Sequence, residues 1–262
     1  MDLTDKVVVV TGGSAGLGEQ ICYEAAKRGA IVVTCARRIN LIGQVKDNCS
    51  ELSEKEAFAF QLDIADPDSV ESVIEKIENE VGKVDVLVNN AGFGLFDNFV
   101  DFDLDVVKNM FNVNVLGMMY FTQKIAISMV NNKNGHIFNV ASMAGKMATP
   151  KSTIYSATKF AVLGFSNALR LELRPENVYV TTINPGPIAT EFFDKADPSG
   201  SYLENLGGIV LDPHKLAKTI INKVGKPTRE INRPFIMEGA SRFYGLFPHI
   251  GDFLAGGLFN RK

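Results

Sequence analysis

Tyr155 and Lys159 are the residues whose types and spacing most directly suggest chemistry. They lie four positions apart, so on a helix both side chains project from the same face. A phenol with its ordinary pKa of ~10 stays protonated at neutral pH, and a neighbouring cation lowers that pKa because it favours the phenolate. The tyrosine would then exchange a proton with a substrate hydroxyl or carbonyl near neutral pH. Such a pair often arises by chance, so its meaning depends on the rest of the chain.

A glycine-rich turn near the start of the chain is the second candidate site. Gly12, Gly16 and Gly18 follow the apolar, β-branched run Lys6–Thr11 and open an amphipathic helical pattern. Glycines at these places allow a tight turn, a close approach of the backbone to a pyrophosphate, and close packing of the helix on the sheet. The helix N-terminus would offer phosphates free N–H groups and a partial positive charge. This context predicts a dinucleotide site.

The end of the next strand predicts which nucleotide is preferred. An NAD site usually has an acidic residue there, which binds the ribose hydroxyls and would repel a 2′-phosphate. Here no acid is present, and Arg37 and Arg38 follow the strand. NADP(H) is therefore favoured over NAD(H), with Arg37 as the preferred phosphate partner and Ser14 as a second one. The alternatives are two solvated loop arginines, or a site that selects NAD.

These candidate sites require a scaffold of alternating strands and helices. The strand-like runs are Lys6–Thr11, Ala30–Cys35, Ala57–Leu62, Val84–Val88, His136–Val140, Val178–Ile183 and about Arg233–Met237. The helical patterns are Gly16–Arg28, Asn40–Leu52, Asp68–Glu80, Leu104–Val130, Thr153–Leu173 and Pro213–Val224. Strands rich in Val and Ile, each followed by a helix, predict a parallel sheet covered on both faces. We expect the α/β class, with a doubly wound, parallel, seven-stranded sheet of the Rossmann type.

No linker, low-complexity segment or change in composition divides the 262 residues, so one domain is expected. Residues 1–240 would form the NADP-binding domain. Within it, residues 190–210 would form a mobile flap over the pocket or an ordinary surface excursion. Residues 241–262 are a Phe- and Leu-rich tail, part of the same domain or of an interface. Its apolar spacing predicts a helical stripe that Pro248 and Gly251 interrupt.

Composition and charge argue against several classes of protein. Hydrophobic residues make up 46% and charged residues 22%, and the net charge is −3, so nucleic acid is not expected as a partner. Cys22, Cys35 and Cys49 lack the spacing of a zinc site, so no metal is expected. Reduced thiols, a first strand with no basic leader, and the absence of an uncharged run of ~18 apolar residues predict a cytoplasmic protein without a membrane span.

Together these residues resemble the short-chain dehydrogenase/reductase superfamily over nearly the whole chain. The glycine motif, Asp63, NNAG at 89–92, Asn114, Ser142, Tyr155, Lys159 and Pro185-Gly186 occur in the family's order. The resemblance implies an enzyme that interconverts a carbonyl and a secondary alcohol by hydride transfer with a nicotinamide cofactor. The cofactor-binding residues expected are Gly12, Ser14, Gly16, Leu17, Gly18, Arg37, Arg38, Asp63, Ile64, Asn90, Ala91, Gly92, Tyr155, Lys159, Pro185, Gly186, Ile188 and Thr190.

The resemblance also implies a role for each catalytic residue. Tyr155 would be the general acid in carbonyl reduction and the general base in alcohol oxidation. Lys159 would hold the nicotinamide ribose and lower the pKa of Tyr155. Ser142 would donate to the substrate oxygen, and Asn114 would hold a water that links Lys159 to solvent. The alternatives are that Ser142 is a strand-end cap and that Asn114 is a helix-kink residue.

Other positions would meet the two ends of the cofactor and the substrate. Asp63 would accept from the adenine amino group, and the Ile188 backbone with the Thr190 hydroxyl would meet the nicotinamide carboxamide. Lys146 would favour an anionic substrate group or face solvent. The substrate-binding residues expected are Ser142, Tyr155, Phe93, Met147 and Phe192, in an apolar lining shared with Phe96, Met143 and Phe193. This lining suits a hydrophobic ketone, an acyl chain or a steroid-like ring.

The expected partners are a small, apolar carbonyl or alcohol substrate and further copies of the chain. A homodimer or homotetramer would form through the helices at 104–130 and 153–173. For the tail, packing in the core or in an interface is the favoured interpretation, followed by a cover for the substrate site. A membrane anchor ranks last, because the tail has few basic residues. A catalytically silent, nucleotide-sensing protein is the alternative from another class.

Overall fold

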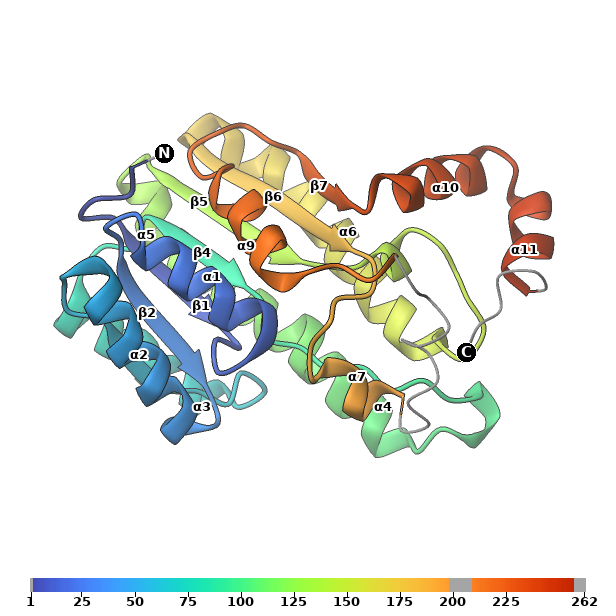
Figure 1. Cartoon of the computed structure of the whole chain (residues 1–262), viewed down its shortest axis with the longest axis horizontal. Coiled ribbons are helices and arrows are strands. Elements are labelled where there is room, and N and C mark those ends of the chain that lie inside the picture. The colour runs from blue at the N-terminus through green and yellow to red at the C-terminus, as the bar shows by residue number, and fades with distance from the viewer. Residues whose placement is uncertain (1, 198–208, 257–262) are drawn as a thin grey trace.

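The frame of the protein is a seven-stranded sheet in which every neighbouring pair of strands is parallel (Figure 1). The computed structural model describes residues 2–197 and 209–256. The strands are β1 (Val7–Thr11), β2 (Ile31–Ala36), β3 (Phe58–Gln61), β4 (Val86–Asn89), β5 (Gly135–Val140), β6 (Val178–Pro185) and β7 (Glu230–Arg233). Their order across the sheet is β3-β2-β1-β4-β5-β6-β7. The predicted doubly wound sheet is confirmed.

Two layers of helices bury the sheet, as the continuous apolar strands require. Val8 and Val10 pack into one core cluster, and Val7 and Val9 into the other, because side chains alternate along a strand. The first face carries α1 (Gly16–Ala26), α2 (Ile39–Ser53) and α9 (Pro213–Ile221). The second carries α3 (Pro67–Lys76), α5 (Met118–Asn131) and the C-terminal half of α6 (Thr153–Leu173). The cores hold Cys22, Cys35 and Cys49 as free, buried thiols.

The order of the strands reverses next to β1, which pairs with β2 on one side and β4 on the other. At their carboxyl ends Thr11 is level with Asn89, and the loops that follow separate to opposite faces of the sheet. Open α/β sheets bind ligands at such a switch point. The fold therefore places the glycine turn and the NNAG segment side by side.

The long helix predicted from residue 104 is divided into three parts. α4 (Leu104–Phe111) leads into the π-helix η3 (Asn112–Gly117) and then into α5. A Cβ at Gly117 would lie 2.0 Å from the Ile64 carbonyl oxygen, so a glycine is needed where this segment crosses the loop after β3. By length and composition, Leu104–Asn131 could cross a membrane, but half of its apolar window is buried inside the fold, as in a core helix.

The last strand and the tail differ from expectation. The seventh strand is Glu230–Arg233, and the predicted run of 233–237 is instead the start of α10 (Phe235–Leu246). The apolar residues after Pro234 gave a strand-like pattern, but they lie on an exposed helix. α11 (Pro248–Gly256) follows after a break at Phe247, as the position of Pro248 predicted. The two helices stand away from the body of the protein (Figure 1), so the described part of the tail does not pack in the core.

Candidate active site

A cleft of about 470 Å³ opens at the carboxyl edge of the sheet. It runs from the loops after β2 and β3, over the glycine turn, to the start of α6 and the loop after β6. All residues proposed from the sequence for cofactor, substrate and catalysis line this cleft, apart from Gly18 and Asn114. The tertiary structure thus brings together residues that are spread over 181 positions, from Gly12 to Phe192 inclusive.

The glycine turn has the geometry that its sequence predicted. Gly12 has φ +67° and Gly16 has φ +59°, a backbone region that favours glycine. A Cβ at Gly18 would lie 2.3 Å from the Gly12 carbonyl oxygen, so only glycine lets α1 approach the turn this closely. Gly16 and Leu17, at the start of α1, line the cleft, and the unpaired N–H groups of a first helical turn suit an anion.

Asn90 locks the NNAG segment to this turn. Its Nδ2 donates to the carbonyl oxygens of Thr11 and Gly12 at 3.1 and 3.0 Å. In return, the Thr11 hydroxyl accepts from the backbone N–H groups of Asn90 and Ala91, both at 3.1 Å. These four bonds join the two loops that flank the switch point and form the floor of the cleft.

The two arginines after β2 have different environments. Arg38 donates to the Ser14 hydroxyl from Nε and Nη2, at 3.3 and 3.0 Å, and its Nη1 lies 3.7 Å from Glu191. Arg37 lines the cleft and the neighbouring hollow formed with Gln61 and Asp63. Both arginines thus lie at the end of the cleft that follows β2, and Arg38 is engaged there by Ser14 and Glu191. The bonds to Ser14 place Arg38 closest to the glycine turn.

Tyr155 and Lys159 lie on the first two turns of α6 and face the cleft. The Lys159 Nζ lies 5.6 Å from the centroid of the Tyr155 ring and donates to the Val140 carbonyl oxygen at 2.9 Å. Their exposed fractions are only 8% and 6%. Burial lowers the pKa of Lys159 from its ordinary value to about 8. The predicted common face of Tyr155 and Lys159 is confirmed.

Asn114 connects the helix that carries this pair to the loop after β4. Its Oδ1 accepts from the Phe93 N–H at 3.0 Å, and its Nδ2 donates to the Phe93 carbonyl oxygen at 2.8 Å and to Thr158 at 3.2 Å. It lies in the π-helix η3, so it does occupy an irregular point of the helix. The side chain connects three elements that meet at the site: the loop after β4, η3 and α6.

Ser142 lies where β5 ends and the short helix η4 (Met143–Gly145) begins. Its hydroxyl accepts from the Ala144 N–H at 3.1 Å, which makes it the cap that the alternative interpretation described, and donates to the Pro185 carbonyl oxygen at 3.4 Å. The side chain is only partly buried and lines the cleft beside Tyr155. Capping fixes its position, and it leaves the hydroxyl on the cleft wall.

Aromatic rings enclose the Tyr155 end of the cleft. Phe96 and Phe192 both lie with ring centroids 5.8 Å from that of Tyr155. Phe193 packs on both of them, at 6.2 and 5.2 Å. Phe192 and Phe193 belong to α7 (Phe192–Ala196), the described part of the predicted flap; residues 198–208 of the flap lie outside the described residues. The apolar lining expected from the sequence is confirmed.

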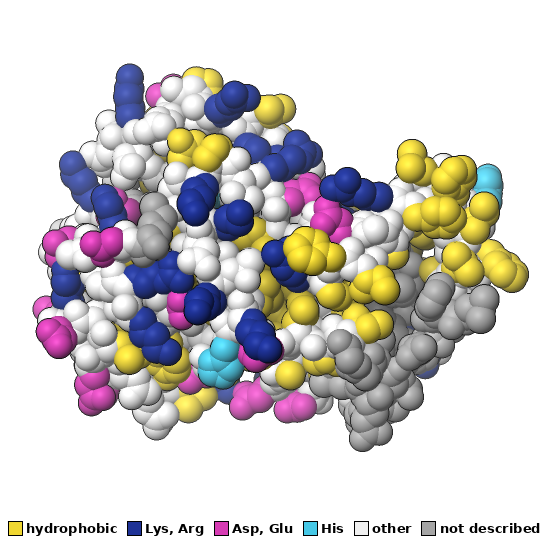
Figure 2. Space-filling model, turned by 45° about the horizontal axis from the view of Figure 1, so that its top comes forward, with side chains coloured by type: hydrophobic (Ala, Val, Ile, Leu, Met, Phe, Trp, Pro, Cys, Tyr) yellow, Lys and Arg dark blue, Asp and Glu magenta, His cyan; other side chains and the backbone are white. Residues whose placement is uncertain are grey.

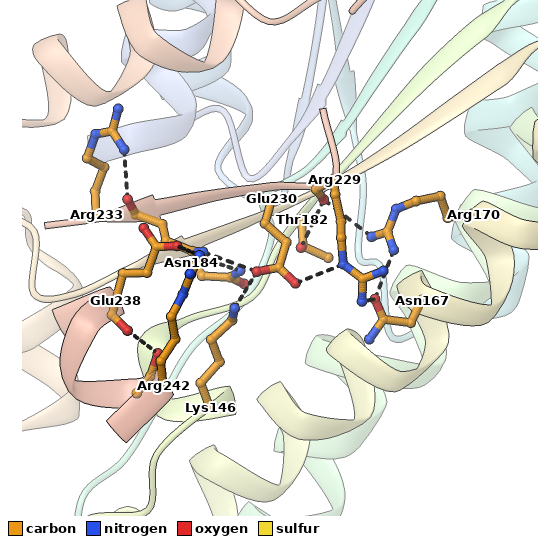
Figure 3. A network of polar contacts seen from close by, with 12 residues as sticks. Lys146, Asn167, Arg170, Thr182, Asn184, Arg229, Glu230, Arg233, Glu238 and Arg242 are labelled. Carbon is orange, nitrogen blue, oxygen red and sulfur yellow. Dashed lines mark hydrogen bonds and ion pairs between the residues drawn. The ribbon is translucent and has the colours of Figure 1, made fainter. Parts of the chain in front are cut away.

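Two features of the site were not predicted. Met237 lines the cleft from α10, which the sequence had suggested to be a strand. Lys146 forms an ion pair with Glu230 of β7, so it is not free to meet an anionic substrate. Figure 3 shows Glu230 at the centre of a polar network that joins η4, β7 and α10. Only the fold reveals these contacts, because the partners are distant in sequence.

The chemistry of this cleft is that of a dinucleotide oxidoreductase. No group of three or more His, Cys, Asp or Glu side chains within residues 2–197 and 209–256 could hold a metal ion. The sequence profile of the short chain dehydrogenase family matches residues 6–199. The chain belongs to this family, whose members are oxidoreductases that act on CH–OH groups and have the Rossmann fold.

Two relatives illustrate the similarity. Human dehydrogenase/reductase SDR family member 7 is 35% identical over 219 residues, which are 82% of this chain and 64% of that protein. The zebrafish 3-dehydrosphinganine reductase is 35% identical over 228 residues, which are 84% of this chain and 69% of that protein. This chain therefore spans about two thirds of the length of these relatives.

Two solved structures have the same fold. A serine dehydrogenase in complex with NADP+ has a TM-score of 0.81 at 28% identity, and the match covers 88% of this chain and 95% of that one. A 3-ketoacyl-(acyl-carrier-protein) reductase from Brucella melitensis, in complex with NADH, has a TM-score of 0.79 at 28% identity and coverage of 88% and 98%. Similar structures thus hold either nicotinamide cofactor.

Proposed function

We propose that this protein is an NADP(H)-dependent oxidoreductase that interconverts an apolar ketone and a secondary alcohol. The observation that carries the proposal is the position of Tyr155 and Lys159. They lie together on one face of α6, nearly buried, in the same cleft as the glycine turn. A phenol beside a buried cation is a proton donor and acceptor suited to carbonyl chemistry.

The residues of the cleft fit a nicotinamide dinucleotide. Gly12 and Gly18 permit the close backbone packing that shapes the turn, since a Cβ at Gly12 would lie 2.8 Å from the Ala91 Cα and one at Gly18 would lie 2.3 Å from the Gly12 carbonyl oxygen. The start of α1 offers N–H groups to the pyrophosphate, and Asp63 with Ile64 lines the adenine end. Pro185, Gly186, Ile188 and Thr190 line the opposite, nicotinamide end. When bound, the cofactor supplies the hydride.

NADP(H) is the preferred cofactor in this proposal. Arg37 and Arg38 lie at the cleft end where an NAD enzyme would carry an acid, and Arg38 is already bound to Ser14. The serine dehydrogenase structure with NADP+ supports the preference, whereas the Brucella reductase with NADH makes NAD the second candidate.

The chain's own residues hold and move the proton. The Lys159 ammonium would stabilise the phenolate of Tyr155, and it is held on the Val140 carbonyl near the expected ribose position. Tyr155 Oη would give its proton to the carbonyl oxygen in reduction and take it back in oxidation. Ser142 would donate a hydrogen bond to the same oxygen as charge develops on it. Asn114 would keep Lys159 connected to solvent through a water.

The substrate is expected to be apolar near its reacting carbon. Phe93, Phe96, Phe192 and Met147 line the cleft around Tyr155, and Lys146, considered from the sequence as a contact for an anionic group, is paired with Glu230 instead. Among the relatives, the name of the zebrafish enzyme describes a reductase of 3-dehydrosphinganine. This apolar lining suits a hydrophobic ketone of that kind better than it suits serine, the substrate in the name of the serine dehydrogenase.

We also propose the assembly and the location. Exposed Leu116, Ile127 and Phe160 lie on the helices of η3, α5 and α6, which suits pairing of two copies there. The 1–240 segment, with its flap at 190–210, would form the catalytic domain. Three buried thiols suit the reducing cytoplasm.

Tyr155→Phe tests the activity. The purified protein is assayed by NADPH absorbance with a panel of hydrophobic ketones. Loss of the phenol should lower kcat by about 10²–10⁴-fold, while the affinity for NADPH measured by fluorescence stays within about twofold. Undiminished turnover in Tyr155→Phe would refute the assignment. If wild-type protein binds NADPH but reduces no ketone, the catalytically silent alternative holds.

A further inference from the structure

The C-terminal helices expose more large apolar side chains than any other part of the described chain. We call α10 and α11, residues Phe235–Gly256, the arm. Its exposed apolar side chains, with their exposed fractions, are Phe235 (67%), Ile236 (71%), Phe243 (42%), Leu246 (75%), Phe247 (51%), Ile250 (51%) and Phe253 (73%). Exposed apolar patches of this kind mark interaction surfaces.

The arm is a folded hairpin with its own internal contacts. A Cβ at Gly251 would lie 2.4 Å from the Tyr244 ring, so glycine permits close packing of α11 on α10. The Tyr244 hydroxyl donates to Asp252 at 2.7 Å, and the rings of Phe243 and Phe247 are 5.2 Å apart. These contacts hold the hairpin together while its apolar side chains point outward.

Charge is distributed unevenly along the arm. Where it joins the body, Arg229 and Lys146 form ion pairs with Glu230, and one turn further Arg242 pairs with Glu238 at 2.6 Å. Arg233 pairs with neither acid and instead stacks on the Phe235 ring, with its Cζ 3.9 Å from the centroid. Among these described residues, the base of the arm therefore has four cations and two acids, an excess of positive charge. Figure 2 shows basic side chains where the arm leaves the body and apolar side chains beyond them. Within α11, Asp252 is the only charged side chain besides a histidine, and it accepts a hydrogen bond from the Tyr244 hydroxyl.

The arm has cations at its base and apolar side chains beyond them. This order matches a bilayer surface, where anionic headgroups lie outside the apolar acyl chains. Apolar side chains enter the acyl region, and arginines with aliphatic stems stay at the level of anionic headgroups. The helices have 12 and 9 residues, and at ~1.5 Å per residue neither can span a hydrocarbon core of ~30 Å. The arm can enter only one leaflet.

The arm is also continuous with the active site. Met237, on the first turn of α10, lines the cleft, and a Cβ at Gly186 would lie 2.5 Å from its sulfur. The Lys146–Glu230 pair ties η4, which follows Ser142, to β7 at the root of the arm. A surface that the arm binds would therefore lie beside the cleft.

We propose that the arm docks this protein on an anionic lipid surface and turns the cleft toward it, so that an apolar substrate enters from the bilayer. The docking stands on the arm alone, whereas the delivery of substrate rests on the function proposed above. A membrane anchor ranked last from the sequence, because the tail itself has few basic residues. The fold brings Arg229, just before β7, and Arg233, at its end, to the root of the arm, which changes that balance.

Vesicle flotation of the full chain tests the docking. The probes are vesicles of phosphatidylcholine, with and without phosphatidylserine. The wild type should float with both, and more strongly with phosphatidylserine at low salt. Leu246→Ser/Phe253→Ser should lower the partition coefficient about a hundredfold, since burying each of the two side chains is worth about a tenfold change. The matched control Val100→Ser/Leu104→Ser removes two side chains that are 87% and 72% exposed on the body, and it should float like the wild type.

Three outcomes would overturn the docking: wild-type protein that stays out of the vesicle fraction, an arm variant that floats unchanged, or equal losses in the arm and control variants. Light scattering identifies the competing occupant, a second copy of the chain. If the arm variant converts an oligomer to a monomer and the wild type does not float, the arm is an oligomer contact.

NADPH fluorescence is measured on the same samples. Flotation without NADPH binding would refute the proposed function and leave the docking intact. NADPH binding without flotation would refute the docking and leave the proposed function intact.

Discussion

The Asn114 carboxamide pairs with both backbone polar groups of Phe93, at 3.0 Å to its N–H and 2.8 Å to its carbonyl oxygen. It therefore acts like a neighbouring strand for an irregular loop, and it ties the loop after β4 to the π-helix. The exposed fraction of Asn114 is 2%. A structural role accounts for the position even before any part in proton transfer is considered.

Asn114→Ala should destabilise the protein by about 2–3 kcal/mol, because it leaves partly buried groups of Phe93 without partners. Urea unfolding measures the loss. Asn109→Ala, on the exposed face of α4, is the matched control and should change the free energy of unfolding by less than about 0.5 kcal/mol. Equal effects of the two substitutions would contradict the proposed support of Phe93.

Arg38 is expected to contribute more to NADPH binding than Arg37, in contrast to the preference inferred from the sequence. Its guanidinium is already held beside the glycine turn by Ser14. Arg38→Ala should weaken NADPH binding about 10–100-fold, as expected for a lost charge-assisted bond, and leave NADH binding nearly unchanged. Fluorescence titration of both variants with both cofactors checks the order. An Arg37→Ala variant that loses more affinity would restore the original assignment.

His136 should make stability depend on pH in the acid range. Burial lowers its pKa to about 3, because it disfavours the charged ring. The neutral ring accepts the Gly225 N–H at Nδ1 and contacts Thr181 through Nε2 at 2.9 Å. The unfolded chain takes up a proton near pH ~6.5, whereas the native state does not. Stability from this group is therefore complete above pH ~6.5 and falls as the pH falls toward 3, by about 1.4 kcal/mol per pH unit.

The measurement is urea unfolding of wild type and His136→Gln between pH 7 and pH 4. The difference between their free energies of unfolding removes the contribution of the carboxylates, which titrate in both proteins. That difference should shrink by about 2–3 kcal/mol over the range. Parallel curves would show that His136 is protonated in the native state.

The Lys146–Glu230 pair should be structural. Both side chains are about one fifth exposed, and Glu230 also accepts from Asn232 at 3.1 Å. Lys146→Met should lower the free energy of unfolding by about 1–2 kcal/mol, because it leaves a partly buried carboxylate without its cation. The KM for an apolar ketone should stay the same. A large rise in KM with unchanged stability would instead support the substrate role considered from the sequence.

Two glycines in helices should respond in opposite ways to alanine. At Gly18 a Cβ would lie 2.3 Å from the Gly12 carbonyl oxygen, so Gly18→Ala should displace the glycine turn and cost at least about tenfold in NADPH affinity. At Gly43, in α2, a Cβ would meet no atom within 4 Å. Gly43→Ala should therefore stabilise the protein by about 0.5–1 kcal/mol and leave NADPH binding unchanged. Calorimetry and fluorescence titration measure the two effects.

Local patterns in the sequence predicted most of the fold. The runs of Val and Ile that end at Thr11 and begin at Val178 are strands, because continuous apolar residues suit a sheet buried on both faces. α6 has the predicted bounds, Thr153–Leu173. The seventh strand was misplaced, because Phe235 and Ile236 looked like buried residues although they lie on an exposed helix. Burial depends on what a segment meets, and a local pattern contains no information about that.

The sequence by itself determined the chemistry available: a phenol and an ammonium on one helix face, and a glycine turn between a strand and a helix. Both are short-range patterns, set by the geometry of a single element. The tertiary structure decided the rest. It bound Arg38 to Ser14, neutralised Lys146 with Glu230, and left the arm exposed beside the cleft. The two pairs join residues that are 24 and 84 positions apart, and the arm is exposed because no distant segment of the described chain covers its apolar side chains. Only the packing of the whole chain determines which distant residues meet.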